Sequence, residues 1–183
     1  MFRQVENVEP DRDALTRIES ACDGWWYTAL LPHAQRIVAY FTDVGTESAQ
    51  VARQPDQFDR LLTKTRALSE LVSANRYERA TSPRSTAANS GHLAQWSGPG
   101  WLAVGDAATS FDPLSSQGLY TSLYHGIMAA EAVHGSMGGN VDALADYAKQ
   151  VESVYSAYLK NRTVYYAMEQ RWQTQPFWAS RIE

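Results

Sequence analysis

A pattern of aromatic and β-branched residues marks the first strong structural signal in the chain. These residues dominate two arms on either side of a turn at 32–35, which predicts a β-hairpin over about 25–42. Alternation places Trp25, Tyr27 and Ala29 on one face and Trp26, Thr28 and Leu30 on the other. Both faces are apolar, so we expect one face to cover a core and the other to line a further surface.

Helical periodicity follows in several later segments. Apolar residues at steps of three and four predict helices over about 56–74, 119–134 and 141–172. The second of these carries apolar residues on one face, namely Leu119, Leu123, Ile127 and Ala130. A short helix is also expected between Pro10 and Ile18, where Leu15 and Ile18 have helical spacing.

A strand, a polar loop and a helix start follow one another between residues 101 and 119. The apolar run Trp101–Val104 predicts a buried strand, and Gly105 after it has no Cβ, which allows a ligand close to the backbone. Asp106 offers an ionised acceptor for sugar or ribityl hydroxyls, and Pro113 fixes the backbone of the loop. The backbone N–H groups at the helix start belong to Gln117, Gly118 and Leu119. Spacing alone leaves two interpretations, a nucleotide-like ligand site and a plain turn with an Asp cap.

Composition narrows the class of protein. The 183 residues carry a net charge of -4 without a basic cluster, which argues against a nucleic-acid partner. Cys22 is the only cysteine and the histidines lie far apart, so we expect neither a disulfide nor a metal site. No apolar run approaches the roughly 20 residues of a membrane helix, and the first residues lack a signal-peptide core. These features predict a soluble, cytoplasmic protein with no membrane partner.

The loop also resembles a known motif. Gly105-Asp106-Ala107-Ala108, Asp112-Pro113 and Gly118 resemble the second FAD-binding motif of the flavin monooxygenase and halogenase superfamily, whose members share the fold of para-hydroxybenzoate hydroxylase. The resemblance implies FAD as the cofactor. It also implies that Asp106 binds the ribityl chain and that Pro113 packs beside the isoalloxazine. The helix that begins at Gly118 would point its N–H groups at the pyrimidine edge of the flavin.

Two segments of the chain favour different branches of that superfamily. The run Asp112-Pro-Leu-Ser-Ser-Gln-Gly118 resembles the halogenase branch, in which the backbone near Gln117 and Gly118 would match a halide site. Tryptophan halogenases also carry Trp-x-Trp-x-Ile-Pro, whose counterpart is Trp25-Trp26-Tyr27-Thr28-Ala29-Leu30. The changes in this segment favour the wider set of halogenase-like FAD oxidoreductases. Trp25 and Tyr27 would form a wall of the substrate cavity, or else pack the hairpin's own core.

The resemblance also predicts the organisation of the chain. We expect a mixed α+β or α/β fold, the C-terminal part of a para-hydroxybenzoate-hydroxylase-like FAD-binding fold, with a substrate-domain β-hairpin and two C-terminal helices. Residues 1–97 would be part of the substrate-binding domain, 98–139 the second half of the FAD-binding domain, and 140–183 a C-terminal helix with an aromatic tail.

The motif that binds the ADP half of FAD is not in this sequence. No Gly-x-Gly-x-x-Gly follows a strand anywhere in it, so the resemblance implies a fragment of an FAD-dependent oxidoreductase. Its partners would be FAD, a small-molecule substrate such as an aromatic compound, and a flavin reductase or the missing N-terminal half. The alternative is a non-catalytic remnant or interaction subunit that keeps the fold and does not bind flavin alone.

Overall fold

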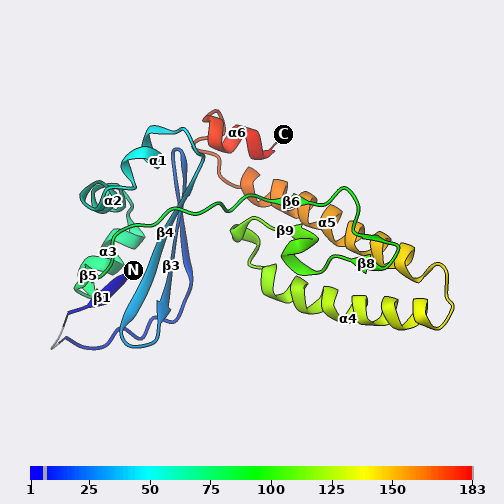
Figure 1. Cartoon of the computed structure of the whole chain (residues 1–183). Helices are drawn as coiled ribbons and strands as arrows, with labels where there is room; N and C mark the ends of the chain where they lie inside the picture. Colours follow the sequence, from blue (N-terminus) through cyan, green and yellow to red (C-terminus); the bar gives the residue numbers. More distant parts are fainter. Residues whose placement is uncertain (6–7, 183) are drawn as a thin grey trace. The chain divides into compact units, whose positions relative to one another are not determined.

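The computed structural model of the chain describes residues 1–5 and 8–182. The chain divides into two compact units, one formed by Met1–Thr86 with Ala167–Glu183 and the other by Ala87–Tyr166 (Figure 1). The first unit is therefore assembled from two separate stretches of chain, whereas the second is continuous. No helix in the described part of the chain is both long enough and apolar enough to cross a membrane.

An antiparallel sheet forms the centre of the first unit. Within the described residues its strand order is β2-β3-β4-β1-β5. The strands are β1 (Phe2–Gln4), β2 (Arg17–Ala21), β3 (Gly24–Leu31), β4 (Gln35–Thr42) and β5 (Tyr77–Arg79). β3 and β4 form a long hairpin over the residues where alternation indicated paired strands. Their connection turns at His33 and Ala34, whose φ angles are 62° and 52°.

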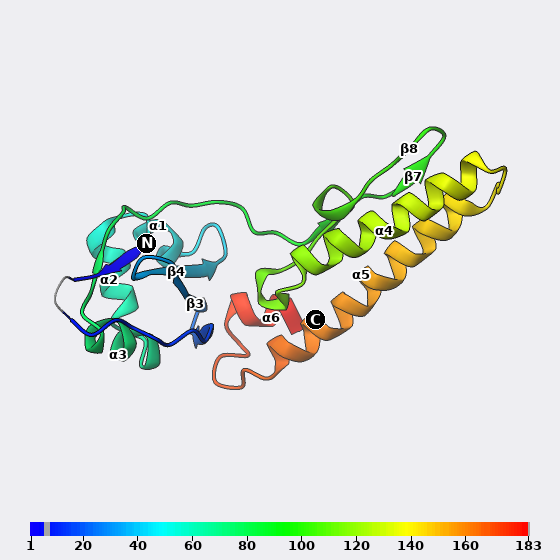
Figure 2. The ribbon, with the colours of Figure 1, turned by 90° about the horizontal axis from the view of Figure 1, so that it is seen from below.

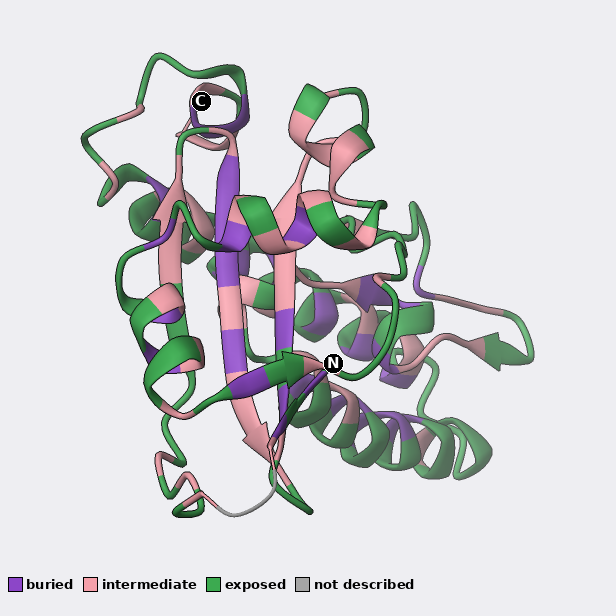
Figure 3. Ribbon diagram, turned by 90° about the vertical axis from the view of Figure 1, so that its left-hand side faces the viewer, coloured by how far each residue is buried: buried purple, intermediate pink, exposed green. Residues whose placement is uncertain are grey.

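Short helices cover one face of this sheet and complete its core (Figure 3). They are α1 (Glu47–Val51), α2 (Pro55–Leu62) and α3 (Ala67–Ala74). The buried side chains of the sheet and helices form one cluster, made of Phe2, Trp26, Val38, Phe58, Leu62, Leu68 and Tyr77. The ring of Trp26 stacks on Tyr40 and meets Phe58 edge-on, with centroids 4.6 and 5.1 Å apart. The hairpin face that carries Trp26 is therefore the core face.

The helix expected over about 56–74 is interrupted between α2 and α3. Glu19 of β2 accepts hydrogen bonds from the backbone N–H groups of Arg66 and Leu68, at 2.5 and 3.0 Å. The Thr65 hydroxyl donates to the carbonyl of Leu62 at 2.6 Å. These bonds satisfy backbone groups that the helix ends leave free. A side chain distant in sequence thus stabilises a break that the local periodicity does not reveal.

The short helix expected between Pro10 and Ile18 was wrong. Residues 17–21 instead form β2, with Ile18 opposite Tyr27 on β3. Pairing with β3 satisfies the backbone groups of this segment, whereas two apolar residues at helical spacing offer little packing. Local spacing was therefore overridden by the neighbouring strand.

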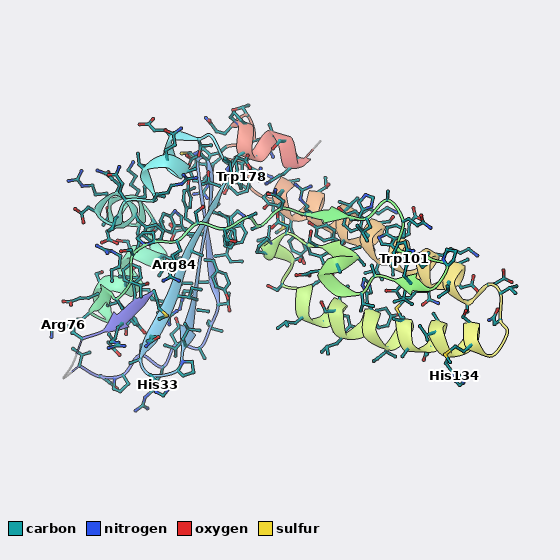
Figure 4. The ribbon with its side chains drawn as sticks, in the orientation of Figure 1. His33, Arg76, Arg84, Trp101, His134 and Trp178 are labelled. Atoms are coloured by element: carbon teal, nitrogen blue, oxygen red, sulfur yellow. The ribbon has the colours of Figure 1, made fainter. Side chains whose placement is uncertain are left out.

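The C-terminal residues belong to the first unit and pack on the rest of it through α6 (Pro176–Ile182). Trp178, labelled in Figure 4, is buried, and its indole N–H donates to the carbonyl of Ala21 at 2.9 Å. The guanidinium of Arg181 donates to both carboxylate oxygens of Asp43, at 2.6 and 3.1 Å. An indole and a bidentate ion pair therefore attach this helix to the end of β2 and to the residue after β4.

Long helices that run side by side in opposite directions form the frame of the second unit (Figures 1 and 2). They are α4 (Gly118–Met137) and α5 (Ala143–Ala167). Short strands accompany them, namely β6 (Gly91–His92), β7 (Ser97–Gly98), β8 (Trp101–Leu102) and β9 (Thr109–Ser110). The core of this unit is a cluster of Trp96, Ala108, Met128, Ala129, Ala132, Tyr147 and Val151. Met128, Ala129 and Ala132 thus lie on the face of α4 that packs in the core.

Several expectations for the second unit need correction. The strand expected over Trp101–Val104 is limited to β8, and Trp101 is 47% exposed rather than buried (Figure 4). The helix expected to reach Trp172 ends at Ala167. The apolar positions of α4 that periodicity places on one face are exposed, and Leu119 and Leu123 are 86% and 72% exposed. α4 is apolar nearly all round, so its periodicity does not decide which face is buried.

Candidate functional site

The Gly105-Asp106 pair forms a tight turn that begins three residues after the end of β8. Gly105 begins a short 3₁₀ helix, η1 (Gly105–Ala107), with a left-handed φ of 58°. A Cβ at Gly105 would lie 2.8 Å from the Oγ of Ser122 on α4, so only glycine fits here without displacement. The N–H of Ala108 donates to the carbonyl of Gly105 at 2.9 Å and closes the turn. Asp106 is left exposed at the surface of the unit.

Asp112 organises the next part of the loop. Its Oδ1 accepts the N–H of Leu114 at 2.9 Å, which caps a second 3₁₀ helix, η2 (Pro113–Ser115). Its carbonyl accepts both the N–H and the hydroxyl of Ser115, at 2.9 and 2.8 Å. Ser116 then takes a left-handed φ of 52°, which turns the chain into α4. The loop is therefore a defined structure with a side-chain cap.

The N-terminus of α4 lies at the end of this loop. The N-cap residue Gln117 makes no side-chain cap hydrogen bond, and its own N–H donates to Ser115 Oγ at 3.3 Å. The first intrahelical bond runs from Thr121 N–H to the Gln117 carbonyl, so the N–H groups of Gly118 and Leu119 have no acceptor inside the helix. These donors and the helix dipole make this end suited to a negatively charged group.

A shallow cavity of about 330 Å³ lies between this loop and residues 87–89. Its lining brings together four of the residues singled out in the sequence: Asp106, Pro113, Gln117 and Gly118. Gly105 is buried and shapes the turn, and Leu119 lies just beyond the cavity lining. The volume is at the lower end of the range for small-ligand sites, so it suits part of a large ligand.

Trp25 and Tyr27 belong to the other unit. Trp25 is 2% exposed and stacks on Phe41 with ring centroids 4.1 Å apart, whereas Tyr27 is half-buried. Both lie on the hairpin face opposite Trp26. Tyr27 is therefore the more accessible of the two side chains.

Residues of α5 that the local sequence pattern did not indicate hold the loop. The hydroxyl of Tyr166 donates to Asp112 Oδ2 at 2.8 Å, and the N–H of Asp112 donates to the hydroxyl of Tyr158 at 2.9 Å. The Nε of Arg162 lies 3.8 Å from the same Oδ2. These residues are spaced by four along α5, so they share one helix face. The spacing of four was the only sequence signal that these α5 residues act together. No neighbouring residue indicated that they contact Asp112.

His125 of α4 does not line the cavity. His125 is fully buried, and neither ring nitrogen has a hydrogen-bond partner among the described residues. Burial lowers the pKa of His125, so its neutral form is favoured. In the described part of the chain, no three His, Cys, Asp or Glu side chains are grouped closely enough to hold a metal ion.

Comparisons with known proteins identify relatives of the chain. Residues 11–182 match the tryptophan halogenase family. LodB of Marinomonas mediterranea, described as an FAD-dependent oxidoreductase, is 31% identical over 179 residues, which make up 97% of this chain and 47% of LodB. The flavin-dependent halogenase CmlS is similar in structure, with a TM-score of 0.78 and 22% identity over 98% of this chain and 33% of CmlS. The myxobacterial chondrochloren halogenase CndH gives a TM-score of 0.77 and 19% identity over 98% of this chain and 42% of CndH.

These matches differ in what they establish. The chain spans about half the length of LodB and less than half of either halogenase. The structural matches show a mixed α/β fold like that of flavin-dependent halogenases. The sequence match over residues 11–182 confirms the resemblance first noted in the loop from Gly105 to Gly118, and this chain belongs to the tryptophan halogenase family.

Proposed function

We propose that this chain supplies the ribityl and isoalloxazine contacts of the FAD site in an FAD-dependent oxidoreductase of the monooxygenase and halogenase type. The observation that carries the proposal is the cavity that Asp106, Pro113, Gln117 and Gly118 line at the N-terminus of α4. The exposed carboxylate of Asp106 accepts hydrogen bonds from ribityl hydroxyls. The exposed ring of Pro113 packs beside the isoalloxazine.

The residues of this site fit a flavin ring. The N–H groups of Gly118 and Leu119 lack acceptors inside α4 and face the pyrimidine edge in this arrangement. When bound, FAD supplies the redox chemistry, and its reduced ring carries negative charge. The positive end of α4 stabilises that charge, which favours the reduced form of the cofactor. Gly105 keeps the turn close to α4 and leaves the Asp106 carboxylate outside.

The contacts to the ADP half of FAD are expected outside this chain. The sequence has no Gly-x-Gly-x-x-Gly after a strand, and the cavity is shallow. α4 also exposes a large set of apolar side chains: Leu119, Tyr120, Leu123, Tyr124, Ile127 and Met137. Exposed apolar patches of this kind mark interaction surfaces. We assign this face to contact with the half of the flavin fold that binds ADP.

We assign a separate contact, with the substrate, to the first unit. The accessible Tyr27 contacts a small-molecule substrate, and Trp25 supports it from within the hairpin face. The hairpin segment departs from the Trp-x-Trp-x-Ile-Pro pattern at Tyr27, Ala29 and Leu30. We therefore assign the chain to the wider set of halogenase-like FAD oxidoreductases.

An NMR titration of the chain with flavin tests this proposal. FMN contains the ribityl and isoalloxazine groups, so it should bind weakly and shift the amide signals of 105–119, whereas ADP should not. Asp106→Asn should weaken FMN binding by about tenfold or more, because hydrogen bonds to a charged group are lost. Glu152→Gln is the matched control, since it neutralises an exposed carboxylate on α5 and should leave binding unchanged.

The alternative function predicts a different result. A non-catalytic interaction unit would keep the apolar face of α4 but show no response of residues 105–119 to FMN. Equal affinities of the Asp106→Asn and Glu152→Gln variants would overturn the role of Asp106. Tight, stoichiometric FAD binding by this chain alone would overturn the assignment of the ADP contacts to another part of the fold.

A further inference from the structure

We propose that Tyr158 and Tyr166 of α5 are positioning residues for the flavin-facing loop. They hold Asp112, and through Asp112 they fix the conformation in which 113–118 borders the cavity. This inference rests on the proposed function for the identity of the ligand, but its structural part can be tested without a ligand.

The two oxygens of the Asp112 carboxylate have different partners. Oδ1 accepts the N–H of Leu114 and so caps η2 inside the loop. Oδ2 accepts the hydroxyl of Tyr166 at 2.8 Å, with the guanidinium of Arg162 at 3.8 Å. The side chain of Asp112 is only 12% exposed, so its negative charge depends on these partners. One carboxylate thus couples the shape of the loop to α5.

Tyr158 connects the two walls of the cavity. Its hydroxyl accepts the N–H of Asp112 at 2.9 Å and lies 2.5 Å from the hydroxyl of Ser90. Ser90 directly follows residues 87–89, which line the cavity opposite the loop. A single buried hydroxyl therefore ties the start of the loop to the segment that faces it.

Arg162 completes the arrangement between the tyrosines. Its guanidinium lies over the ring of Tyr166, 5.5 Å from the centroid, and its Nε has no hydrogen-bond partner among the described residues. The cation is thus held near Oδ2 by ring contact and charge rather than by a direct hydrogen bond. This contact keeps the guanidinium beside the carboxylate oxygen that accepts the hydroxyl of Tyr166.

A loop with a fixed shape binds better than one that must be ordered by the ligand. Ser116 has a left-handed backbone, which a serine adopts only when its surroundings enforce it. Gly118 and Leu119 follow Ser116 by two and three residues, so the direction of their N–H groups depends on the same turn. Loss of the α5 hydroxyls should free the loop, and the ligand would then have to order it on binding.

Hydroxyl deletions on α5 provide the test. Tyr158→Phe and Tyr166→Phe each remove one hydroxyl and keep the ring. Tyr155→Phe is the matched control, because Tyr155 is also buried on α5 and its hydroxyl makes no hydrogen bond among the described residues. The first measurement is amide hydrogen exchange at 114–118 without ligand. The second is FMN affinity at a temperature where every variant is fully folded.

We expect exchange at 114–118 to be about tenfold faster in the Tyr158→Phe and Tyr166→Phe variants than in the control, with FMN binding weakened by a similar factor. A purely structural role would lower the melting temperature but leave the FMN affinity of the folded protein unchanged. Exchange equal to that of the Tyr155→Phe variant would overturn the positioning role. Faster exchange with unchanged FMN affinity would overturn its link to the ligand.

The two proposals fail in distinguishable ways. If FMN does not bind the unmodified chain, the proposed function fails. The exchange rates at 114–118 still decide whether Tyr158 and Tyr166 hold the loop.

Discussion

Substitution of Gly105 by alanine probes the turn on which the candidate site depends. Gly105 has a left-handed φ of 58°, and a Cβ there would lie 2.8 Å from Oγ and 3.1 Å from Cβ of Ser122. The left-handed backbone costs a non-glycine residue about 1–2 kcal/mol. Relief of the contact with Ser122 adds about 1–3 kcal/mol, as in other overpacked sites. We therefore expect Gly105→Ala to lower the free energy of unfolding by about 2–5 kcal/mol.

The same change at Gly126 is the matched control. Gly126 lies inside α4, and a Cβ there would meet no heavy atom within 4 Å. Alanine has the higher helix propensity, so Gly126→Ala should raise the free energy of unfolding by about 0.5–1 kcal/mol. The same added methyl group is thus expected to lower the free energy of unfolding at Gly105 and to raise it at Gly126.

Urea unfolding followed by circular dichroism measures both effects, since α4 and α5 contribute much of the helical signal. A Ser122→Ala background removes the hydroxyl contact while the strained backbone remains. The cost of Gly105→Ala should therefore be smaller in that background but should not vanish. An unfolding midpoint of Gly105→Ala equal to that of the unmodified chain would refute this account of the turn.

Three further predictions concern ion pairs and the exposed helix face. The hydrogen bond from Arg171 lowers the pKa of Glu169 from 4.5 to about 2, so the stability it contributes is complete above the ordinary value and is lost as pH falls toward 2. Glu169→Gln should remove this loss of stability at low pH, which urea unfolding at a series of pH values measures. If the free energy of unfolding of the variant varied with pH as that of the unmodified chain does, the prediction would be wrong. Arg36→Met leaves the buried Asp11 carboxylate without its cation and should cost about 3–5 kcal/mol in the same assay, whereas a loss below about 1 kcal/mol would count against it. Leu123→Lys on the exposed face of α4 should change stability by no more than about 0.5 kcal/mol in the same assay, and strong destabilisation would show a buried face.

Local sequence signals predicted those elements whose stability is itself local. The β3–β4 hairpin follows from aromatic and β-branched residues on both sides of a turn. The Gly105-Asp106 turn and the start of α4 also lie where the glycines indicated. In each case the decisive residues are neighbours in sequence.

Features that depend on distant residues were not predictable in the same way. The break between α2 and α3 depends on Glu19, which belongs to β2. The role of Asp112 depends on Tyr158 and Tyr166, which follow it by 46 and 54 residues. The choice of the buried face of α4 depends on its packing in the core, because Leu123 is as apolar as the residues that are buried. These outcomes are set by tertiary contacts rather than by local periodicity.

The division of the first unit into two stretches has a consequence for synthesis. The sheet is complete once residue 86 has been made, but Phe177 and Trp178 of α6 reach it only after the whole second unit has been translated. At ordinary translation rates this interval is roughly 5 to 20 s, during which the end of β2 lacks its indole partner. The second unit has all of its residues by Tyr166. The unit that emerges first from the ribosome is therefore the last to be completed.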